Sequence, residues 1–161
     1  DLKNKTVLEY GCSIGTLTRK LAKKVLPNGK VYAFDHIEHN VNVANKHLKR
    51  NKHVSVNHHA DLEQFKTKVK MPLADVLVSA GSFSYLQNPQ QVLKHLGEKV
   101  KRGGRIVFLD YDNFFYLLPN VAWLSDDKKL KRMFKEAGFK IQIVKKRRLF
   151  WQNIFIHGEK V

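Results

Sequence analysis

Residues 6–16 read TVLEYGCSIGT, and this stretch decides the fold of the chain. It starts as an apolar, β-branched run, passes through a turn that contains Gly11 and Gly15, and leads into a segment with helical spacing. A strand, a glycine turn and a helix in this order are typical of the first unit of an open α/β sheet. The same letters also spell G-x-S-x-G, the nucleophile elbow of a hydrolase.

The elbow hypothesis makes Ser13 a nucleophile, with Asp110 and His157 available as acid and base in the expected chain order. An elbow normally follows several strands, and an earlier strand-to-helix loop supplies part of its oxyanion hole. Only ten residues precede Gly11 in this chain, and they offer no such loop. The sequence therefore favours the alternative, in which the turn holds a nucleotide-type cofactor at a helix N-terminus.

Short apolar runs alternate with amphipathic stretches along the chain, which predicts βαβ units. Strands are expected at residues 6–10, 30–34, 53–57, 74–79, 105–110, 139–144 and 150–157. Helices are expected near residues 15–26, 39–50, 89–100 and 126–137, and Gly103-Gly104 is expected to form a turn. The predicted fold class is α/β, a Rossmann-like, doubly wound, seven-stranded and mostly parallel sheet. A C-terminal antiparallel hairpin completes it, because the Lys145–Arg148 link is too short for a parallel crossover.

The 161 residues suit one domain, which we expect to lack N-terminal elements because the chain starts at Asp1 and enters a strand almost at once. Its apolar runs fall far short of the ~18 residues that span a bilayer, so no stable membrane insertion is expected. The single Cys12 predicts a reducing, cytoplasmic setting. The scattered histidines have no ligand spacing, so no metal site is predicted.

The net charge is +16, from 30 Lys and Arg against 14 Asp and Glu. Such a basic protein suggests nucleic acid, anionic lipid or another acidic partner. The positive residues are spread along the chain, however, and this also fits a composition without any such partner.

Acidic residues are few, yet four of them, Glu9, Asp35, Asp61 and Asp110, lie at or just past predicted strand ends. Ligands of open α/β sheets bind at this edge. Asp35 follows Gly15 by 20 residues, where a carboxylate can bind both hydroxyls of a ribose. Several acids against a basic background favour a cationic cofactor over a dinucleotide, whose pyrophosphate prefers basic groups.

The segment "VLEYGCSIGT" resembles the first motif of class I S-adenosylmethionine-dependent methyltransferases, V-L-(D/E)-x-G-x-G-x-G. "VYAFD" with the following His36 resembles the second motif, and "HHADLEQF" the third. The block from Ala74 to Asp110 and the C-terminal "AGFKIQIVKKRRLFWQNIFIHGEK" resemble the later strands of the same fold. The resemblance covers nearly the whole chain and is closest to the broad, small-molecule type. Its main departure is Ser13, where the family usually has glycine.

The resemblance implies S-adenosylmethionine as cofactor, with contacts from four regions. The first loop would hold the methionine part through Glu9, Gly11, Ser13 and Gly15. Asp35 would bind the ribose and His36 would pack on the adenine, with Asp61 and Leu62 at the adenine amino group. Ser79 and Ala80 would face the cofactor from the fourth strand. Plain structural roles stay open as alternatives: a tight turn for the two glycines, and caps for Asp61 and Asp110.

Methyl transfer from a sulfonium needs positioning more than acid–base groups, so no catalytic residue is predicted. The aromatic stretch "DYDNFFYLLPNVAW" is expected to cover an acceptor pocket, or to form a hydrophobic lid or dimer contact. The expected pocket residues are Tyr85, Asp110, Tyr111, Asn113, Phe114, Phe115, Tyr116 and Trp151. The chain lacks the (N/D)-P-P-(Y/F) motif of many enzymes that methylate amino groups of nucleobases or glutamine.

Three function classes follow. The first is a methyltransferase acting on a small-molecule or lipid-like acceptor. The second is an RNA methyltransferase, favoured by the charge and by Lys145–Arg148 beside Phe150 and Trp151, since bases stack on aromatic rings in basic grooves. The third is a non-catalytic binding module of the same fold. The sequence does not indicate the oligomeric state.

Overall fold

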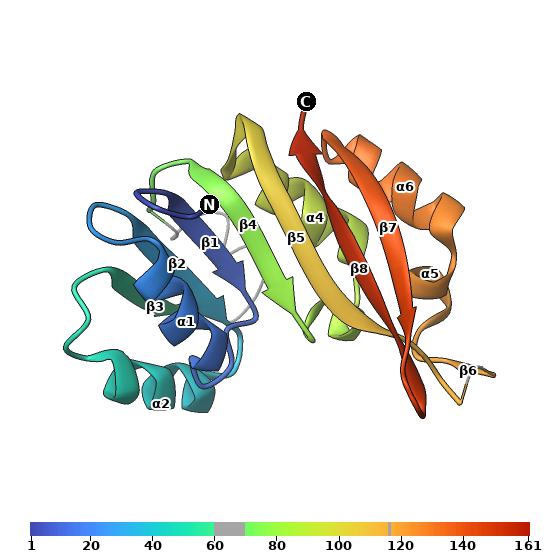
Figure 1. Ribbon diagram of the computed structural model, residues 1–161, viewed down its shortest axis with the longest axis horizontal. Coiled ribbons are helices and arrows are strands. Elements are labelled where there is room, and N and C mark those ends of the chain that lie inside the picture. The colour runs from blue at the N-terminus through green and yellow to red at the C-terminus, as the bar shows by residue number, and fades with distance from the viewer. Residues whose placement is uncertain (60–69, 116) are drawn as a thin grey trace. The chain divides into compact units, whose positions relative to one another are not determined.

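The computed structural model describes residues 1–59, 70–115 and 117–161. The chain forms two compact units, residues 1–78 and 79–161, which are described in turn (Figure 1). Asp61, Leu62 and Tyr116, all named above as expected site residues, lie outside the described residues.

Parallel strands make up the sheet of the first unit. Its elements are β1 (Thr6–Tyr10), α1 (Thr16–Lys24), β2 (Lys30–Asp35), α2 (Glu38–Leu48), β3 (Val54–His58) and β4 (Ala74–Ala80), the last of which ends in the second unit. The strands run in the order β3-β2-β1-β4, and every pairing among them is parallel. The alternating strand and helix pattern therefore predicted this unit correctly.

The core of the first unit forms because α1 is amphipathic. Its apolar face, formed by Leu21 and Ala22 with Val25 at the C-cap, is buried. This face packs against Val7 and Val31 of the sheet, while the lysines of the helix stay exposed. Burial of a side chain of this size contributes on the order of 1.5–3 kcal/mol, so this contact fixes the helix on the sheet.

Antiparallel strands make up the sheet of the second unit. Its elements are η1 (Phe83–Tyr85), α4 (Pro89–Glu98), β5 (Val100–Phe114), β6 (Leu118–Pro119), α5 (Ala122–Ser125), α6 (Asp127–Glu136), β7 (Phe139–Arg147) and β8 (Trp151–Lys160). Strand β8 pairs with both β5 and β7, and β6 pairs with the end of β5. The predicted hairpin is thus confirmed, and all seven predicted strands are present in this α/β, Rossmann-like fold.

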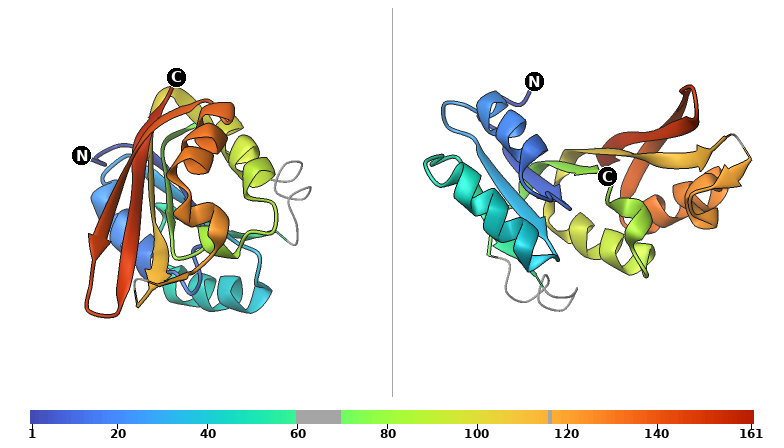
Figure 2. Two further views of the ribbon diagram at one scale, coloured as in Figure 1. Left: turned by 90° about the vertical axis from the view of Figure 1, so that its right-hand side faces the viewer. Right: turned by 90° about the horizontal axis from the view of Figure 1, so that it is seen from below.

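Aromatic rings form the core between this sheet and its helices. Phe83 of η1 lies 4.8 Å from Phe108 of β5, and Phe108 lies 5.7 Å from Phe134 of α6, each in an edge-on arrangement. In the left view of Figure 2, α5 and α6 lie on one side of the β5, β7 and β8 strands. A half-covered antiparallel sheet of this kind explains why buried and more exposed residues alternate along β7 and β8.

Helix caps follow the sequence signals. The Asn88 side chain accepts from Gln91 N at 3.2 Å before α4, and Asp126 accepts from Lys128 N and Lys129 N before α6. The described residues form no helix long and apolar enough to cross a membrane.

Two details differ from the expectations. The predicted turn at Gly103-Gly104 lies inside β5, which starts at Val100; Gly103 takes a left-handed φ of 74°, and pairing with β8 begins only at Arg105. The strand thus accommodates the glycine pair as an irregularity before its pairing with β8 begins. Helix α5 and strand β6 were not predicted, because four and two residues are too short to show a period.

Candidate functional site

The loop between β1 and α1 depends on left-handed backbone at three positions. Gly11, Ser13 and Gly15 have φ values of 77°, 49° and 85°. Glycine adopts this region freely, whereas a side chain makes it strained. Ser13 thus occupies a position whose conformation favours glycine, which explains in physical terms why the family usually has glycine there.

Asp35 ties this loop to the end of β2. Its Oδ2 accepts from Ser13 N at 2.8 Å and its Oδ1 accepts from Ile37 N at 2.9 Å, while the side chain is almost fully buried. The backbone adds two bonds, because Gly11 N and Cys12 N both donate to Phe34 O at 2.8 and 2.9 Å. The loop is therefore held in one shape from the β2 side.

Glu9 is a buried carboxyl group beneath the loop. It is 2% exposed, and its Oε2 has no hydrogen-bond partner among the described residues. The pKa of Glu9 is raised to about 7, chiefly by burial; the nearby Thr18 hydroxyl acts to lower it, and the charge of Asp35 acts to raise it. A buried carboxylate with an unsatisfied oxygen is costly unless a cation or donor joins it.

Gly15 brings the loop close to α2. A Cβ at this position would meet Leu48 Cδ1 at 3.0 Å and Ala44 Cβ at 3.2 Å. The neighbouring Cys12 is buried, and burial together with the charges of Glu9 and Asp35 raises the pKa of its thiol. Cys12 therefore stays protonated and serves as a small packing residue.

His36 lies at the rim of the same site. Its side chain is 64% exposed, and its Nδ1 is 3.9 Å from Asp35 Oδ1. The first unit thus brings six of the expected cofactor residues to one strand edge: Glu9, Gly11, Ser13, Gly15, Asp35 and His36.

The second unit contains a pocket of about 220 Å³. Its lining residues are Ala80, Gly81, Leu109, Asp110, Tyr111 and Asn153. The pocket brings Ala80, an expected cofactor contact, together with the expected acceptor residues Asp110 and Tyr111. Ser79, beside Ala80, is fully buried, and its hydroxyl oxygen has no hydrogen-bond partner within the described part of the chain.

The Asp110 carboxylate accepts hydrogen bonds from Ser84 and from its neighbour Tyr111. It accepts from Ser84 N at 2.9 Å, from Ser84 Oγ at 3.0 Å and from Tyr111 N at 2.8 Å. Asp110 therefore holds η1 in place, a capping role of the kind that the sequence left open. Tyr85, the last residue of η1, is highly exposed.

Three expected acceptor residues meet next to this pocket. The Tyr111 ring lies 6.2 Å from Phe114 and 6.4 Å from Trp151, and all three side chains are partly exposed. Sequence reasoning missed Asn153, whose buried Oδ1 has no partner among the described residues. The only signal was an asparagine inside a strand, where Asn is uncommon.

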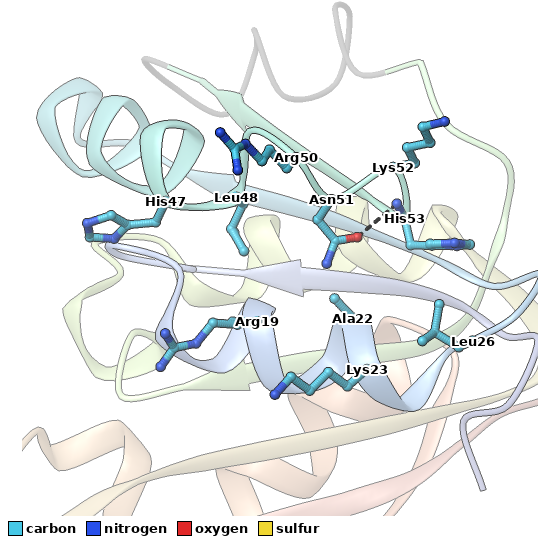
Figure 3. A pocket seen from close by; sticks show the side chains of 10 residues that line it. All are labelled: Arg19, Ala22, Lys23, Leu26, His47, Leu48, Arg50, Asn51, Lys52 and His53. Carbon is cyan, nitrogen blue, oxygen red and sulfur yellow. Dashed lines mark hydrogen bonds between the residues drawn. The ribbon is translucent and has the colours of Figure 1, made fainter.

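A second pocket, of about 510 Å³, lies in the first unit and was not expected. Figure 3 shows Arg19 and Lys23 extending from α1, and Arg50 and Lys52 from the segment between α2 and β3. None of these four cations forms an ion pair with any residue that the structure describes. The remaining lining residues are Ala22, Leu26, His47, Leu48, Asn51 and His53.

Comparison with known proteins identifies methyltransferases as relatives of this chain. A family model described as "Methyltransferase domain" matches residues 1–152. Malonyl-[acyl-carrier protein] O-methyltransferase 2 of Ilyobacter polytropus is 29% identical over 133 residues, which are 80% of this chain and 48% of that protein. Demethylmenaquinone methyltransferase of Alkalihalophilus pseudofirmus is 26% identical, over 82% of this chain and 69% of that protein.

Among solved structures, a SAM dependent methyltransferase from Aquifex aeolicus superposes with a TM-score of 0.76. The alignment covers 98% of this chain and 84% of the other at 23% identity, a level that shows a shared fold. The chain spans about half the length of the malonyl-[acyl-carrier protein] O-methyltransferases that it matches, from 38% to 53%.

Proposed function

We propose that this chain, which belongs to the class I S-adenosylmethionine-dependent methyltransferase family, binds that cofactor and methylates a small-molecule or lipid-like acceptor. Family membership supports the cofactor interpretation of the glycine turn over the hydrolase elbow. Ser13 would then belong to the cofactor loop.

The observation that carries the proposal is the pair of buried carboxylates at the loop. Glu9 and Asp35 are both almost fully buried, and Glu9 has no cationic partner among the described residues. A ligand with a sulfonium and an ammonium would supply the missing positive charge. The residues present therefore fit S-adenosylmethionine, and they would not favour a pyrophosphate.

Each residue has a role consistent with its surroundings. Asp35 would accept from the ribose hydroxyls, because each of its two oxygens receives one backbone N–H from the described residues and has a second lone pair. Glu9 and the left-handed loop would hold the methionine part, and the exposed ring of His36 would cover the adenine. Bound S-adenosylmethionine supplies a methyl group that is already activated.

The second unit would then position the acceptor. Ala80, Tyr111 and Asn153 line a pocket in which the acceptor atom can be held and shielded from water. Such positioning can account for most of the rate of an in-line displacement, with effective molarities of ~10⁵ M or more. The exposed rings of Phe114 and Trp151 beside the pocket favour an apolar acceptor.

RNA is the second candidate acceptor, and the basic pocket of the first unit favours it. Four cations that form no ion pair within the described residues line this pocket together with Ala22, Leu26 and Leu48, and such a surface suits a phosphodiester chain. We expect Arg19→Glu with Lys23→Glu to lower RNA affinity and its salt dependence. Lys131→Glu with Arg132→Glu on α6 is the control, since it removes the same charge from exposed positions outside the pocket.

A transfer assay with tritium-labelled S-adenosylmethionine tests the proposed function. Label that passes into organic-extractable material from a lipid extract, and is lost with Asp35→Ala, would support the leading acceptor class. Label in RNA instead would favour the second class. If no label is transferred and the folded protein also binds no S-adenosylhomocysteine, the non-catalytic alternative is favoured.

A further inference from the structure

The second unit ends in a large exposed apolar surface, which we call the apolar tip. Its residues come from the end of β5, from β6 and from the β7–β8 turn: Phe114, Phe115, Leu117, Leu118, Leu149, Phe150 and Trp151. Leu117 is 84% exposed and Leu149 is 80% exposed. Contiguous apolar exposure of this kind is uncommon and marks an interaction surface.

The two hairpins form one surface. Phe114 is the direct neighbour of Trp151 across the β5–β8 pair. Beyond this pair, Phe115 N donates to Phe150 O at 2.7 Å and their rings lie 6.1 Å apart. Arg148 N donates to Trp151 O at 2.8 Å and closes the β7–β8 turn, so the turn presents Leu149 and Phe150 outward. In Figure 1 the label β6 marks this end of the unit.

The charge around the apolar tip is positive. Lys146, Arg147 and Arg148 come directly before Leu149. The only acid in the described parts of 111–120 and 146–152 is Asp112, which is buried and paired with Lys145 at 3.3 Å. Exposed apolar side chains with cations at their base are the pattern of a protein surface that rests on anionic lipid.

We propose that the apolar tip docks this protein on the surface of an anionic lipid bilayer. A second copy fits less well, because it would bring two clusters of like charge together. Nucleobases could stack on Phe150 and Trp151, but stacking gives no role to the exposed leucines. Aliphatic and aromatic side chains together suit the boundary between lipid headgroups and acyl chains.

Tyr111 connects the apolar tip to the acceptor pocket. It lies against Phe114 and Trp151 on one side and lines the pocket on the other. An apolar acceptor dissolved in the bilayer would thus reach the pocket past Tyr111 without crossing water. This step rests on the proposed function, whereas docking itself does not.

The test is co-sedimentation of the full chain with vesicles of phosphatidylcholine alone or with phosphatidylglycerol. We expect binding at least ~10-fold stronger to the anionic vesicles, and a loss of about 10-fold or more for Leu149→Ser, since removing one such side chain from lipid costs more than 1.4 kcal/mol. The matched control is Leu73→Ser, an exposed leucine of the first unit that is 48% exposed. Circular dichroism melting checks that both variants fold.

Charge is tested separately. Arg148→Glu should weaken binding to anionic vesicles, whereas Arg132→Glu on α6 should not. Equal binding of the Leu149→Ser and wild-type proteins would overturn the inference, as would preference for an RNA oligonucleotide over vesicles. A dimer that Leu149→Ser dissociates, seen by sedimentation velocity without any vesicle binding, would assign the tip to a second copy instead. S-adenosylhomocysteine binding that persists in any of these cases would leave the proposed function intact.

Discussion

The backbone N–H of Ser13 donates to Asp35 Oδ2 at 2.8 Å, so the carboxylate that would bind the ribose also holds the cofactor loop. The other oxygen of the same carboxylate accepts from Ile37 N, so both oxygens that would face the ribose also hold the backbone. Loss of Asp35 is therefore expected to change both the stability of the first unit and its affinity for the cofactor.

Asp35→Ala should lower the free energy of unfolding by about 1–3 kcal/mol, because two backbone N–H groups lose their acceptor. Asp35→Asn keeps one acceptor oxygen and should cost less. Urea denaturation followed by circular dichroism measures both. Equal stability of wild type and Asp35→Ala would show that the loop does not depend on this carboxylate.

Glu9 should make stability depend on pH. Its folded pKa of about 7 lies above the ordinary 4.5, so the folded state binds more protons between these values and stability falls as pH rises from 4.5 to 7. Glu9→Gln removes the free-energy cost of ionising this buried carboxyl group. It should stabilise the protein by about 3 kcal/mol at pH 8 and hardly at all at pH 4.5. Thermal melts at both pH values test this, and a gain independent of pH would argue against the buried carboxylate as its source.

Substitutions at two of the left-handed loop positions, Ser13 and Gly15, should change stability by different amounts. Ser13→Gly removes backbone strain and adds flexibility to the unfolded chain, so stability should change by less than ~1 kcal/mol and cofactor affinity should persist. Gly15→Ala must accept a φ of 85° and a 3.0 Å approach to Leu48, and should destabilise by more than 1 kcal/mol. Melting curves of both variants measure the difference; similar losses for the two would contradict the assigned geometry.

Lys145 should be structural although it belongs to a basic cluster. Its ammonium lies 2.9 Å from Asp127 and 3.3 Å from the buried Asp112. Burial lowers the pKa of Lys145, but Asp127 and Asp112 raise it more. Lys145→Met leaves Asp112 buried and unpaired, which should cost about 3 kcal/mol of unfolding free energy. Lys146→Met is the matched control and should cost less than 1 kcal/mol by urea denaturation.

Much of the fold was predictable because periodicity and glycine turns are local signals. The strand edge carrying Glu9 and Asp35 followed from the rule that parallel strands end on the same side. The Asp110–Ser84 bonds and the place of Asn153 in a pocket depend on which strands pair, and no local pattern encodes that. The basic pocket joins α1 to a segment some thirty residues later, so charge counts alone could not locate it.

The measurement that tests the central claim most directly is calorimetric titration with S-adenosylhomocysteine, comparing wild type with Asp35→Ala and Asp35→Asn. We expect wild-type binding that both variants weaken by a factor of about 10 or more, equivalent to 1.4 kcal/mol. Asp35→Asn separates the two roles, because it should lose affinity while keeping more of its stability. Wild-type protein that is folded and shows no binding would contradict the assignment of this loop as the cofactor site.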